Sequence, residues 1–444
     1  MNTKHSIYIL QKALDKLSEG FSDLIPYNEY ESAEIEKILM QVAEKMQDNF
    51  PYHHPLYAGQ MLKPPHEIAR LAYILSMWIN PNNHALDGGR ASSAMEKEAV
   101  ANIALMFGWN EYVGHLTSGG TFANLEALWV AGNIHPKKNI VASELAHYTH
   151  ERISNVLGIK FQKILCNNKG EMDVNKLETK LKLGTIGTVV VTMGTTGTGS
   201  VDPLVEILEL RKKYDFRIHL DAAYGGYFGL SDQLAESTQN KYLLMLEADS
   251  IVVDPHKHGL QPYGCGCILF KNPAVGKYYK HDSPYTYFSS TELHLGEISL
   301  ECSRAGASAV GLWATQQLFP MVKGGAFSAR LNSSFRAAQK LYSKIVADSR
   351  FIVLFQPETD IVVWAFKCKT ISQINKSSKE ILEKVAAKNL HLALLNYSVR
   401  LLPKTWNGIE KDIDYVTCLR SCLMKPEHDE WVDVIWDIVT EAVE

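Results

Sequence analysis

One residue of this sequence is placed where it could take part in covalent chemistry: a lysine that closely follows an apolar run typical of a buried strand. Lys257 lies in the segment DPHKHG, immediately after the apolar run SIVV. An amine held in an apolar site can form an imine with an aldehyde. A lysine at the tip of an ordinary loop would explain the same position. Lys257 alone therefore indicates covalent chemistry without settling it.

A second strand end carries a carboxylate. Asp221 follows the run RIHL and precedes Ala222 and Ala223 in HLDAAYGG. The pyridine nitrogen of pyridoxal 5′-phosphate (PLP) needs such a partner to stay protonated, and the protonated ring then accepts electrons. Small residues beside the carboxylate would let a flat ring lie against the backbone. An aspartate in a turn is the alternative, because the motif DAA is weak alone.

A glycine turn before a helix provides a candidate phosphate site. In HLTSGGTFANLEALWVAG, the residues Ser118, Gly119, Gly120 and Thr121 precede a helical pattern, and Thr121 is the expected N-cap. Free N–H groups at a helix start and the helix dipole both favour an anion. An ordinary capped loop has the same composition, so the turn also needs support from other residues.

Two histidines accompany these groups. His147, in SELAHYTHER, could stack on a flat ring, and His256, beside Lys257, could bond a phosphate or carry a proton. A packed or exposed histidine is the alternative at both positions. His147 and His150 have loose metal-ligand spacing, but the pattern offers no third ligand, so we expect no metal site.

The elements that must position these residues follow from the hydrophobic pattern. The apolar runs NIVASE, TVVVTMG, RIHLDAA, SIVVDPH and CGCILFK alternate with helix-like segments such as PLVEILELRKKY. Buried strands alternating with helices predict a mainly parallel sheet in an α/β domain. Ligands bind beyond the carboxyl ends of such strands, and the polar candidates fall at those ends.

The two ends of the chain differ from this middle. A Pro- and aromatic-rich segment, 51–65, follows N-terminal helices, and a helical stretch runs from about 305 to 345. DIVVWAF, LHLALLNY and YVTCLRSCLM then read as strands, and EWVDVIWDIVTEAV reads as a helix. We expect an N-terminal helical wrapping segment (1–65), a large cofactor-binding domain (66–330) and a small α/β C-terminal domain (331–444).

Composition narrows the class of function. The chain has 444 residues, is 46% hydrophobic and carries a formal charge of −4, with neither a basic excess nor a charged run. We therefore expect a small-molecule substrate rather than nucleic acid. A signal peptide and an apolar run of about 18 residues are both missing, so we expect no membrane contact. Seven scattered cysteines fit a reducing, cytoplasmic compartment.

Several stretches together resemble the group II PLP-dependent amino-acid decarboxylases, which share the aspartate-aminotransferase-like fold (fold type I). The stretches are SSAMEKEAV, TSGGTFANLEAL, SELAHYTHER, MGTTGTGSVDP, HLDAAYGG, DPHKHGLQPYGCGCILF, LECSRAG and LRSCLMKP. They extend over most of the chain, from about residue 50 to 426. DPHKHGLQPYG and HLDAAYGGYFGL are most similar to the tyrosine/aspartate decarboxylase branch, and the sphingosine-phosphate lyases are near relatives.

The resemblance implies a role for each candidate. Lys257 would form the imine with PLP, Asp221 would pair with the pyridine nitrogen, and His147 would stack on the ring. The remaining cofactor contacts would be Ser118, Gly119, Gly120 and Thr121 around the phosphate with His256 nearby, Ala223 against the other face of the ring, and Thr195 near the cofactor or the substrate carboxylate. Arg304, in LECSRAG, would lie near the phosphate or across a dimer interface.

The substrate pocket is less well defined by pattern. The segment 51–65 offers His53, His54, Tyr57 and Gln60 as lining residues, although structural loop packing explains it equally well. The resemblance also implies a homodimer with shared active sites, around which the N-terminal helices would wrap.

A mobile loop of the family often supplies a tyrosine that protonates Cα. Here SPYTYFSSTELHLGE offers Tyr285 and Tyr287. Aromatic-amino-acid decarboxylases carry their tyrosine nearer to the arginine motif than these residues are to Arg304. This departure leaves both the proton donor and an aromatic substrate open.

The predicted reaction is decarboxylation of an L-amino acid to its amine and CO2. The same lysine and aspartate would also serve a carbon–carbon lyase or a decarboxylation-dependent oxidative deaminase, because what differs is the Cα bond that stands perpendicular to the ring. A non-catalytic PLP-fold scaffold is a further alternative, against which Lys257, Asp221 and His147 argue. The sequence does not name the amino acid.

Overall fold

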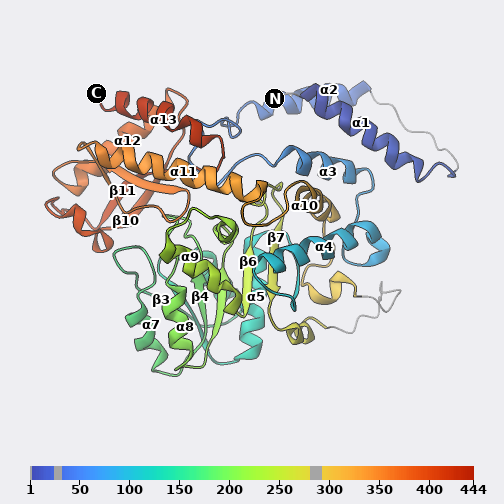
Figure 1. Cartoon of the computed structure of the whole chain (residues 1–444), viewed down its shortest axis with the longest axis horizontal. Coiled ribbons are helices and arrows are strands. Elements are labelled where there is room, and N and C mark those ends of the chain that lie inside the picture. Colours follow the sequence, from blue (N-terminus) through green and yellow to red (C-terminus); the bar gives the residue numbers. More distant parts are fainter. Residues whose placement is uncertain (1–2, 25–32, 281–292) are drawn as a thin grey trace.

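The computed structural model describes residues 3–24, 33–280 and 293–444. Helices α1 (Thr3–Glu19) and α2 (Ala33–Met46) lie at one edge of the molecule, beyond α3 (Glu67–Met77) and away from both sheets (Figure 1). The predicted N-terminal helices are thus confirmed. Within the described ranges, no helix is long and apolar enough to cross a bilayer.

A seven-stranded sheet forms the centre of the larger part of the chain. Its strand order is β1-β7-β6-β5-β4-β2-β3, with β2 to β6 parallel and β7 antiparallel to both of its neighbours. The predicted, mainly parallel sheet is therefore confirmed. The strands are β1 (Val113–Thr117), β2 (Asn139–Ser143), β3 (Phe161–Ile164), β4 (Ile186–Thr192), β5 (Arg217–Asp221), β6 (Ser250–Val253) and β7 (Gly266–Phe270).

Both faces of this sheet are covered by helices, which explains its continuous apolar runs. In β4, Val189 and Val191 pack into the core on one face, whereas Val190 packs on the opposite face. Helices α5 and α6 cover the Val190 face, and α4, α7, α8, α9 and α10 contribute to the other. Their bounds are α4 (Arg90–Met106), α5 (Gly120–Ile134), α6 (Thr149–Val156), α7 (Val174–Leu181), α8 (Leu204–Arg211), α9 (Glu236–Leu243) and α10 (Gly306–Leu318).

A second, antiparallel sheet of four strands has the order β10-β11-β9-β8. Three helices pack on it around Trp364, which is fully buried. The strands are β8 (Phe351–Val353), β9 (Ile361–Phe366), β10 (Ala393–Ser398) and β11 (Tyr415–Cys422), and the helices are α11 (Ala326–Ala347), α12 (Ile371–Ala386) and α13 (His428–Ala442). Short 3-10 helices complete the described chain: η1 (Leu86–Gly88), η2 (Gly226–Leu230), η3 (Leu244–Glu247), η4 (Pro273–Tyr278), η5 (Leu295–Ile298), η6 (Val399–Leu401) and η7 (Lys404–Trp406).

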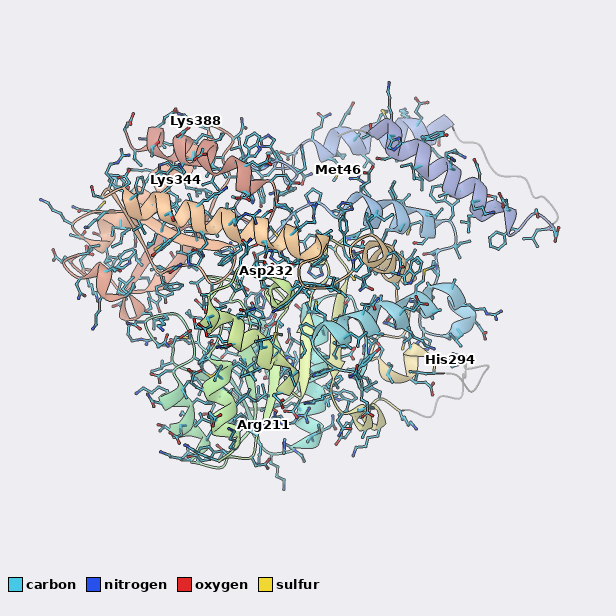
Figure 2. The ribbon with its side chains drawn as sticks, in the orientation of Figure 1. Met46, Arg211, Asp232, His294, Lys344 and Lys388 are labelled. Carbon is cyan, nitrogen blue, oxygen red and sulfur yellow. The ribbon has the colours of Figure 1, made fainter. Side chains whose placement is uncertain are left out.

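Helix α11 joins the two parts. Its first turns place Phe327 and Leu331 in the core of the large sheet, while Leu341 and Ile345 lie in the core of the second sheet. Figure 2 shows Lys344 on this helix, and its ammonium lies 2.6 Å from Asp433 on α13. The domain boundary expected at residue 330 thus falls inside a helix that serves both cores.

The helical stretch expected from 305 to 345 is two helices, α10 and α11. The chain leaves α10 at Phe319, and the break contains Pro320 and Gly324. Proline cannot donate to the helix, and Gly324 has φ of +71°, a conformation that favours glycine. This break turns α11 away from α10 and toward the second sheet.

The Pro- and aromatic-rich segment 51–65 packs mainly against the second sheet. The amide of Cys422 donates to the carbonyl of Ala58 at 2.7 Å, and the amide of His391 donates to Leu56 at 2.9 Å. Tyr57 is 5% exposed and forms a bridge with His391. These contacts hold the segment 51–65 against the C-terminal part of the chain.

Candidate active site

A cavity of about 420 Å³ lies at the carboxyl ends of the parallel strands. The residues after β4, β5 and β6 meet there with the turn before α5, because parallel strands deliver their carboxyl ends to one edge. Nine predicted cofactor residues line the cavity: Ser118, Gly119, Gly120, Thr121, His147, Asp221, Ala223, His256 and Lys257.

Asp221, the last residue of β5, is buried and ionised. His150 Nε2 lies 2.8 Å from its Oδ2, and both side chains are almost fully enclosed. Burial alone would raise the pKa of Asp221, but the hydrogen bond and charge of His150, together with Lys257 and His219, hold it well below its usual range. The cavity thus contains a permanent carboxylate, which suits a protonated ring nitrogen.

Lys257 reaches the cavity from the turn after β6. Its Nζ lies 3.0 Å from Oδ2 of Asp254, and its side chain is 21% exposed. The turn is closed by the amide of Lys257, which donates to the carbonyl of Asp254 at 2.9 Å. Asp254 is only 2% exposed, so the amine is fixed beside a buried carboxylate while remaining open to a ligand.

His256 and His147 both present neutral rings. Nδ1 of His256 donates to the carbonyl of Cys265 at 2.8 Å, so this nitrogen carries the proton. Nδ1 of His147 accepts from the amide of Thr149 at 3.3 Å, which holds the ring before α6 begins. Burial lowers the pKa of each histidine, more than nearby carboxylates raise it.

The glycine turn before α5 needs glycine at one position for its backbone angle and at the next for space. Gly119 has φ of +151°, and a Cβ on Gly120 would lie 2.5 Å from a carboxylate oxygen of Asp254. The helix begins at Gly120 with Gly119 as the N-cap, so the expected N-cap role of Thr121 is wrong. Helical geometry thus begins two residues earlier than expected, and the turn packs directly on Asp254. The first N–H groups of α5 lack partners within the helix and border the cavity.

A buried network ties this turn to β5. Asn124 donates to the carbonyl of Gly120 at 2.8 Å, and its Oδ1 lies 2.8 Å from Nε2 of His219. His219 Nδ1 lies 2.9 Å from the hydroxyl of Ser250 on β6. Burial lowers the pKa of His219 to about 3, so its ring is neutral. The anion turn, β5 and β6 are therefore held in one arrangement.

Thr195 does not line the cavity. It is 1% exposed, and its hydroxyl lies 2.7 Å from that of Thr198, with Ser200 next in the chain of hydroxyls. Thr196, the following residue, lines the cavity instead, together with Thr192. The sequence pattern thus predicts the correct loop after β4, but the residue of that loop that faces the cavity is Thr196 and not Thr195.

Arg304 lies behind the glycine turn rather than in the cavity. Its guanidinium is 2.8 Å from Glu96 and donates to the carbonyl of Leu116 on β1 at 2.6 Å. Glu96 also accepts from the amide of Leu116. The pair fixes the end of β1, from which the turn begins, and the side chain of Arg304 is only 6% exposed.

The expected pocket residues of the 51–65 segment also stay outside this cavity. His54 packs its ring against Trp431 at 4.9 Å between centroids, Tyr57 packs against His391, and Gln60 is exposed. His53 is exposed as well. Tyr285 and Tyr287 lie outside the described residues.

Comparison with known proteins shows the family of this chain. Residues 122–369, more than half of the chain, match the family model described as the pyridoxal-dependent decarboxylase conserved domain. The chain belongs to the pyridoxal-dependent decarboxylase family. It is a PLP enzyme of fold type I that converts an amino acid to an amine and CO2.

Curated relatives and solved structures are similar to this decarboxylase over most of its length. The L-tyrosine decarboxylase of Enterococcus faecium is 26% identical over 462 residues, which span 78% of this chain and 75% of the relative. The L-aspartate decarboxylase of Thermococcus kodakarensis is 28% identical over 63% of this chain and 72% of its own. The solved Oryza sativa TDC with PLP and tryptamine has a TM-score of 0.80 at 16% identity, covering all of this chain and 99% of that one.

The residues of this decarboxylase fit PLP. A volume of about 420 Å³ lies within the roughly 300–1,000 Å³ typical of small-molecule sites. One wall offers the free N–H groups of α5 to a phosphate, and the others offer an ionised aspartate, a neutral histidine and a lysine amine. These are the groups that the anion, the ring and the aldehyde of PLP require.

Four residues in or behind the cavity are not among the predicted site residues. His150 was seen only as half of a rejected metal pair, and Asp254 only as part of a strand end. Tyr224 lines the cavity beside Ala223, and Arg420 is a buried arginine on β11. Asp254 and Tyr224 adjoin predicted residues, so their position in DPHKHG and HLDAAYGG was a usable signal. Arg420 lies in LRSCLMKP, a stretch that carries the family resemblance, but only the packing of the two sheets brings it near the cavity.

Proposed function

We propose that this decarboxylase acts on an L-amino acid and that Lys257 is the residue that carries its cofactor. The observation that supports this most is the meeting of Lys257, Asp221, His147 and the α5 turn around one cavity. Each of these groups serves a different part of PLP. When bound, PLP supplies the electron sink for the pair that remains on Cα as the carboxylate leaves.

Asp221 keeps the site ready for that chemistry. Its pKa lies well below the usual range, so it carries a negative charge throughout neutral pH. A buried charge of this kind stabilises a proton on the ring nitrogen opposite it. His150 does not line the cavity itself but contacts Asp221, which does, and we assign it the task of holding Asp221 in place and charged.

Lys257 would hold the cofactor through its amine and would give way to the amine of the substrate. Exchange requires protons to move between the two amines, and Asp254 lies 3.0 Å from the Lys257 amine. His256, whose Nδ1 proton is bonded to Cys265, can accept a proton only at Nε2. His147 provides a flat, uncharged surface for the ring.

Arg420 is our candidate for orienting the substrate carboxylate. Its side chain is 5% exposed and donates to the carbonyls of Gly59 and Gly197, one residue from Thr196 of the cavity. Its Nη2 has no hydrogen-bond partner among the described residues. The one remaining nitrogen can align a carboxylate while stabilising it less than a contact through two nitrogens would, which suits a group that must leave uncharged.

A panel of L-amino acids, scored for CO2 and for amine, tests the proposal. L-Tyrosine and L-aspartate belong in it because relatives carry those names. We expect at least one substrate to yield both products in equal amounts, and Lys257→Ala to abolish turnover and the visible absorption of the bound cofactor. Release of an aldehyde in place of the amine would contradict the proposed outcome, and an active Lys257→Ala would exclude the role of this lysine.

We further propose that the decarboxylase is a homodimer of the cytoplasm. An exposed apolar face on α2 supports the dimer, since Ile35, Ile38, Leu39, Val42 and Met46 are 47% to 63% exposed at helical spacing. Figure 2 shows Met46 at the end of this helix. All seven cysteines are free thiols, which fits a reducing compartment. Fractionation of native cells tests the compartment.

A further inference from the structure

A buried carboxylate from the second sheet contacts both segments that carry the proposed catalytic groups. Asp360 lies directly before β9 and is fully buried. The hydroxyl of Tyr224 donates to its Oδ1, and Nε2 of His258 lies 3.2 Å from its Oδ2. Tyr224 follows Asp221 by three residues, and His258 follows Lys257 directly. One side chain thus reaches both catalytic loops.

The protonation states make this an anion with two neutral partners. Burial would raise the pKa of Asp360, but His258 and the Tyr224 hydrogen bond hold it below its usual value. Burial lowers the pKa of His258 and, with Asp360, raises that of Tyr224 well above 10. Tyr224 therefore keeps the proton that it donates to Asp360, and the neutral ring of His258 lies beside the other carboxylate oxygen. Charge-assisted bonds of this kind are stronger and more directional than neutral ones.

The same contact defines one wall of the cavity. The ring of Tyr224 lines it, and that ring meets His258 edge-on at 4.9 Å between centroids. Phe228 also meets the ring of His258 edge-on, at 5.0 Å between centroids. His258 therefore has little freedom, and a shift of its ring moves the backbone that carries Lys257.

The start of β9 is itself fixed to the large sheet. The hydroxyl of Thr359 donates to the carbonyl of Gly199 at 3.3 Å, in the loop after β4. The carbonyl of Asp360 accepts from the amide of Leu423 at 2.8 Å, which ties it to the end of β11. Asp360 is thus held from both sides and can serve as a fixed point for the two loops.

We propose that Asp360 is a positioning residue for the decarboxylation, which sets Lys257 and Tyr224 relative to Asp221 from the second sheet. The inference rests on the proposed roles of Lys257 and Asp221. It assigns no contact between Asp360 and the substrate. Its consequence is that the second sheet, and not only the large one, determines where the Lys257 amine stands.

The test replaces each member of the contact and compares catalysis with folding. Asp360→Asn removes the charge at constant shape, and we expect kcat to fall roughly ten- to a hundredfold, because misplacing a reacting group by about 1 Å costs that much. KM should change little, and the absorption spectrum of the lysine-bound cofactor should shift. Tyr224→Phe and His258→Met conserve volume and should lower kcat in the same way. Adding Asp360→Asn to the Tyr224→Phe, His258→Met double variant should then cost little more.

Asp348→Asn is the matched control, because this aspartate pairs with Arg350 outside the cavity and should leave kcat unchanged. A folded Asp360→Asn variant with wild-type kcat and spectrum overturns the inference. It is also overturned if the decreases in kcat caused by the three substitutions multiply when they are combined. If Asp360→Asn does not fold, wild-type kcat in both partner variants overturns it. Lys257→Ala distinguishes failure of the proposed function from failure of the inference about Asp360. If Lys257→Ala keeps the cofactor absorption, the proposed function is wrong. If Lys257→Ala is inactive while Tyr224→Phe and His258→Met have wild-type kcat, only the role of Asp360 is refuted.

Discussion

The charge of Asp221 depends on His150, a histidine that does not line the cavity. Their side chains meet at 2.8 Å, with His150 fully buried and Asp221 almost fully so. An isolated buried carboxylate would take up a proton, and a neutral carboxylic acid is a poor partner for a ring nitrogen that must stay protonated. The function of one residue is therefore set by a neighbour behind it.

Replacing His150 by leucine should lower kcat by roughly ten- to a hundredfold, since a hydrogen bond to a charged group contributes about 1.5–3 kcal/mol. Without His150 the pKa of Asp221 rises, so the acid limb of the kcat profile should move to higher pH. His150→Gln retains a donor and should recover part of the activity. Rate measurements across pH decide this, with His135→Gln at the far end of α5 as control; an unmoved acid limb in His150→Leu contradicts the assignment.

The sequence could name the residue types of the site better than their orientation. SELAHYTHER contains both His147 and His150, and only the start of α6 at Thr149 decides which faces the cavity. That helix has no side-chain N-cap to mark its start. Thr195 and Thr196 differ in the same way, by one step of a loop. Residue spacing alone carries no information on such rotations.

At the level of elements, the junction of β1 and α5 depends on the absence of side chains. Gly120→Ala would place a methyl group 2.5 Å from the carboxylate of Asp254, which itself holds Lys257. We expect the Kd for PLP to rise about tenfold, in line with overpacking costs of about 1–3 kcal/mol. Titration of the cofactor-free protein measures it. Gly276→Ala, whose Cβ meets nothing within 4 Å, is the control, and equal affinities in the two variants speak against this reading of the turn.

The docking of α13 should make stability depend on pH. His428, its first residue, is buried and contacts the carbonyl of Pro55 through Nε2 at 2.9 Å. Burial lowers its pKa to about 3, against about 6.5 when unfolded, so the unfolded chain binds the extra proton between these values. Stability is therefore complete above about pH 6.5 and falls as pH drops, by up to about 1.4 kcal/mol per unit for this group.

Urea unfolding from about pH 4 to 7 tests this. His428→Gln should be less stable than the parent at neutral pH but should lose less stability on acidification. The exposed residue His53 provides the control, since His53→Gln should follow the parent. If the free energy of unfolding changes with pH in the same way in the parent and in His428→Gln, this histidine does not contribute to the pH dependence of stability.

Strands buried on both faces were the most predictable elements. The runs before Asp221 and Lys257 became β5 and β6 because continuous apolar residues with β-branched side chains suit a covered parallel sheet. The runs singled out in the sequence did not include β1, β3, β8 or α12. The break between α10 and α11 also lay hidden within one helical pattern. Tertiary packing, rather than periodicity, divides such stretches.

At the scale of the whole molecule, the N-terminal helices have an apolar face that no other part of the described chain covers. We expect a second copy to cover it. Ile38→Glu together with Leu39→Glu should convert the dimer to a monomer, because dimerisation would then bury two unpaired charges at the centre of an apolar interface. Sedimentation velocity measures the change. Lys37→Glu, on another face of α2, should leave the dimer intact, and a monomeric parent protein contradicts the proposal.

The arrangement of the two sheets was the least predictable feature. Arg420 and Asp360 lie far from Lys257 in sequence, and neither belongs to a motif around it. Only the packing of β9 and β11 against the large sheet brings them to the site. The cofactor residues follow local strand ends and were visible in sequence, whereas groups supplied by the second sheet required the fold.

The central claim is that Lys257 carries the cofactor, and one measurement addresses it directly. The PLP-loaded enzyme is reduced with borohydride, digested, and its peptides are sequenced by mass spectrometry. Reduction fixes the lysine–cofactor bond, so the phosphopyridoxyl group should appear on the peptide containing DPHKHG, at Lys257. The modification on another lysine, or an unmodified Lys257 in an active preparation, would contradict the account.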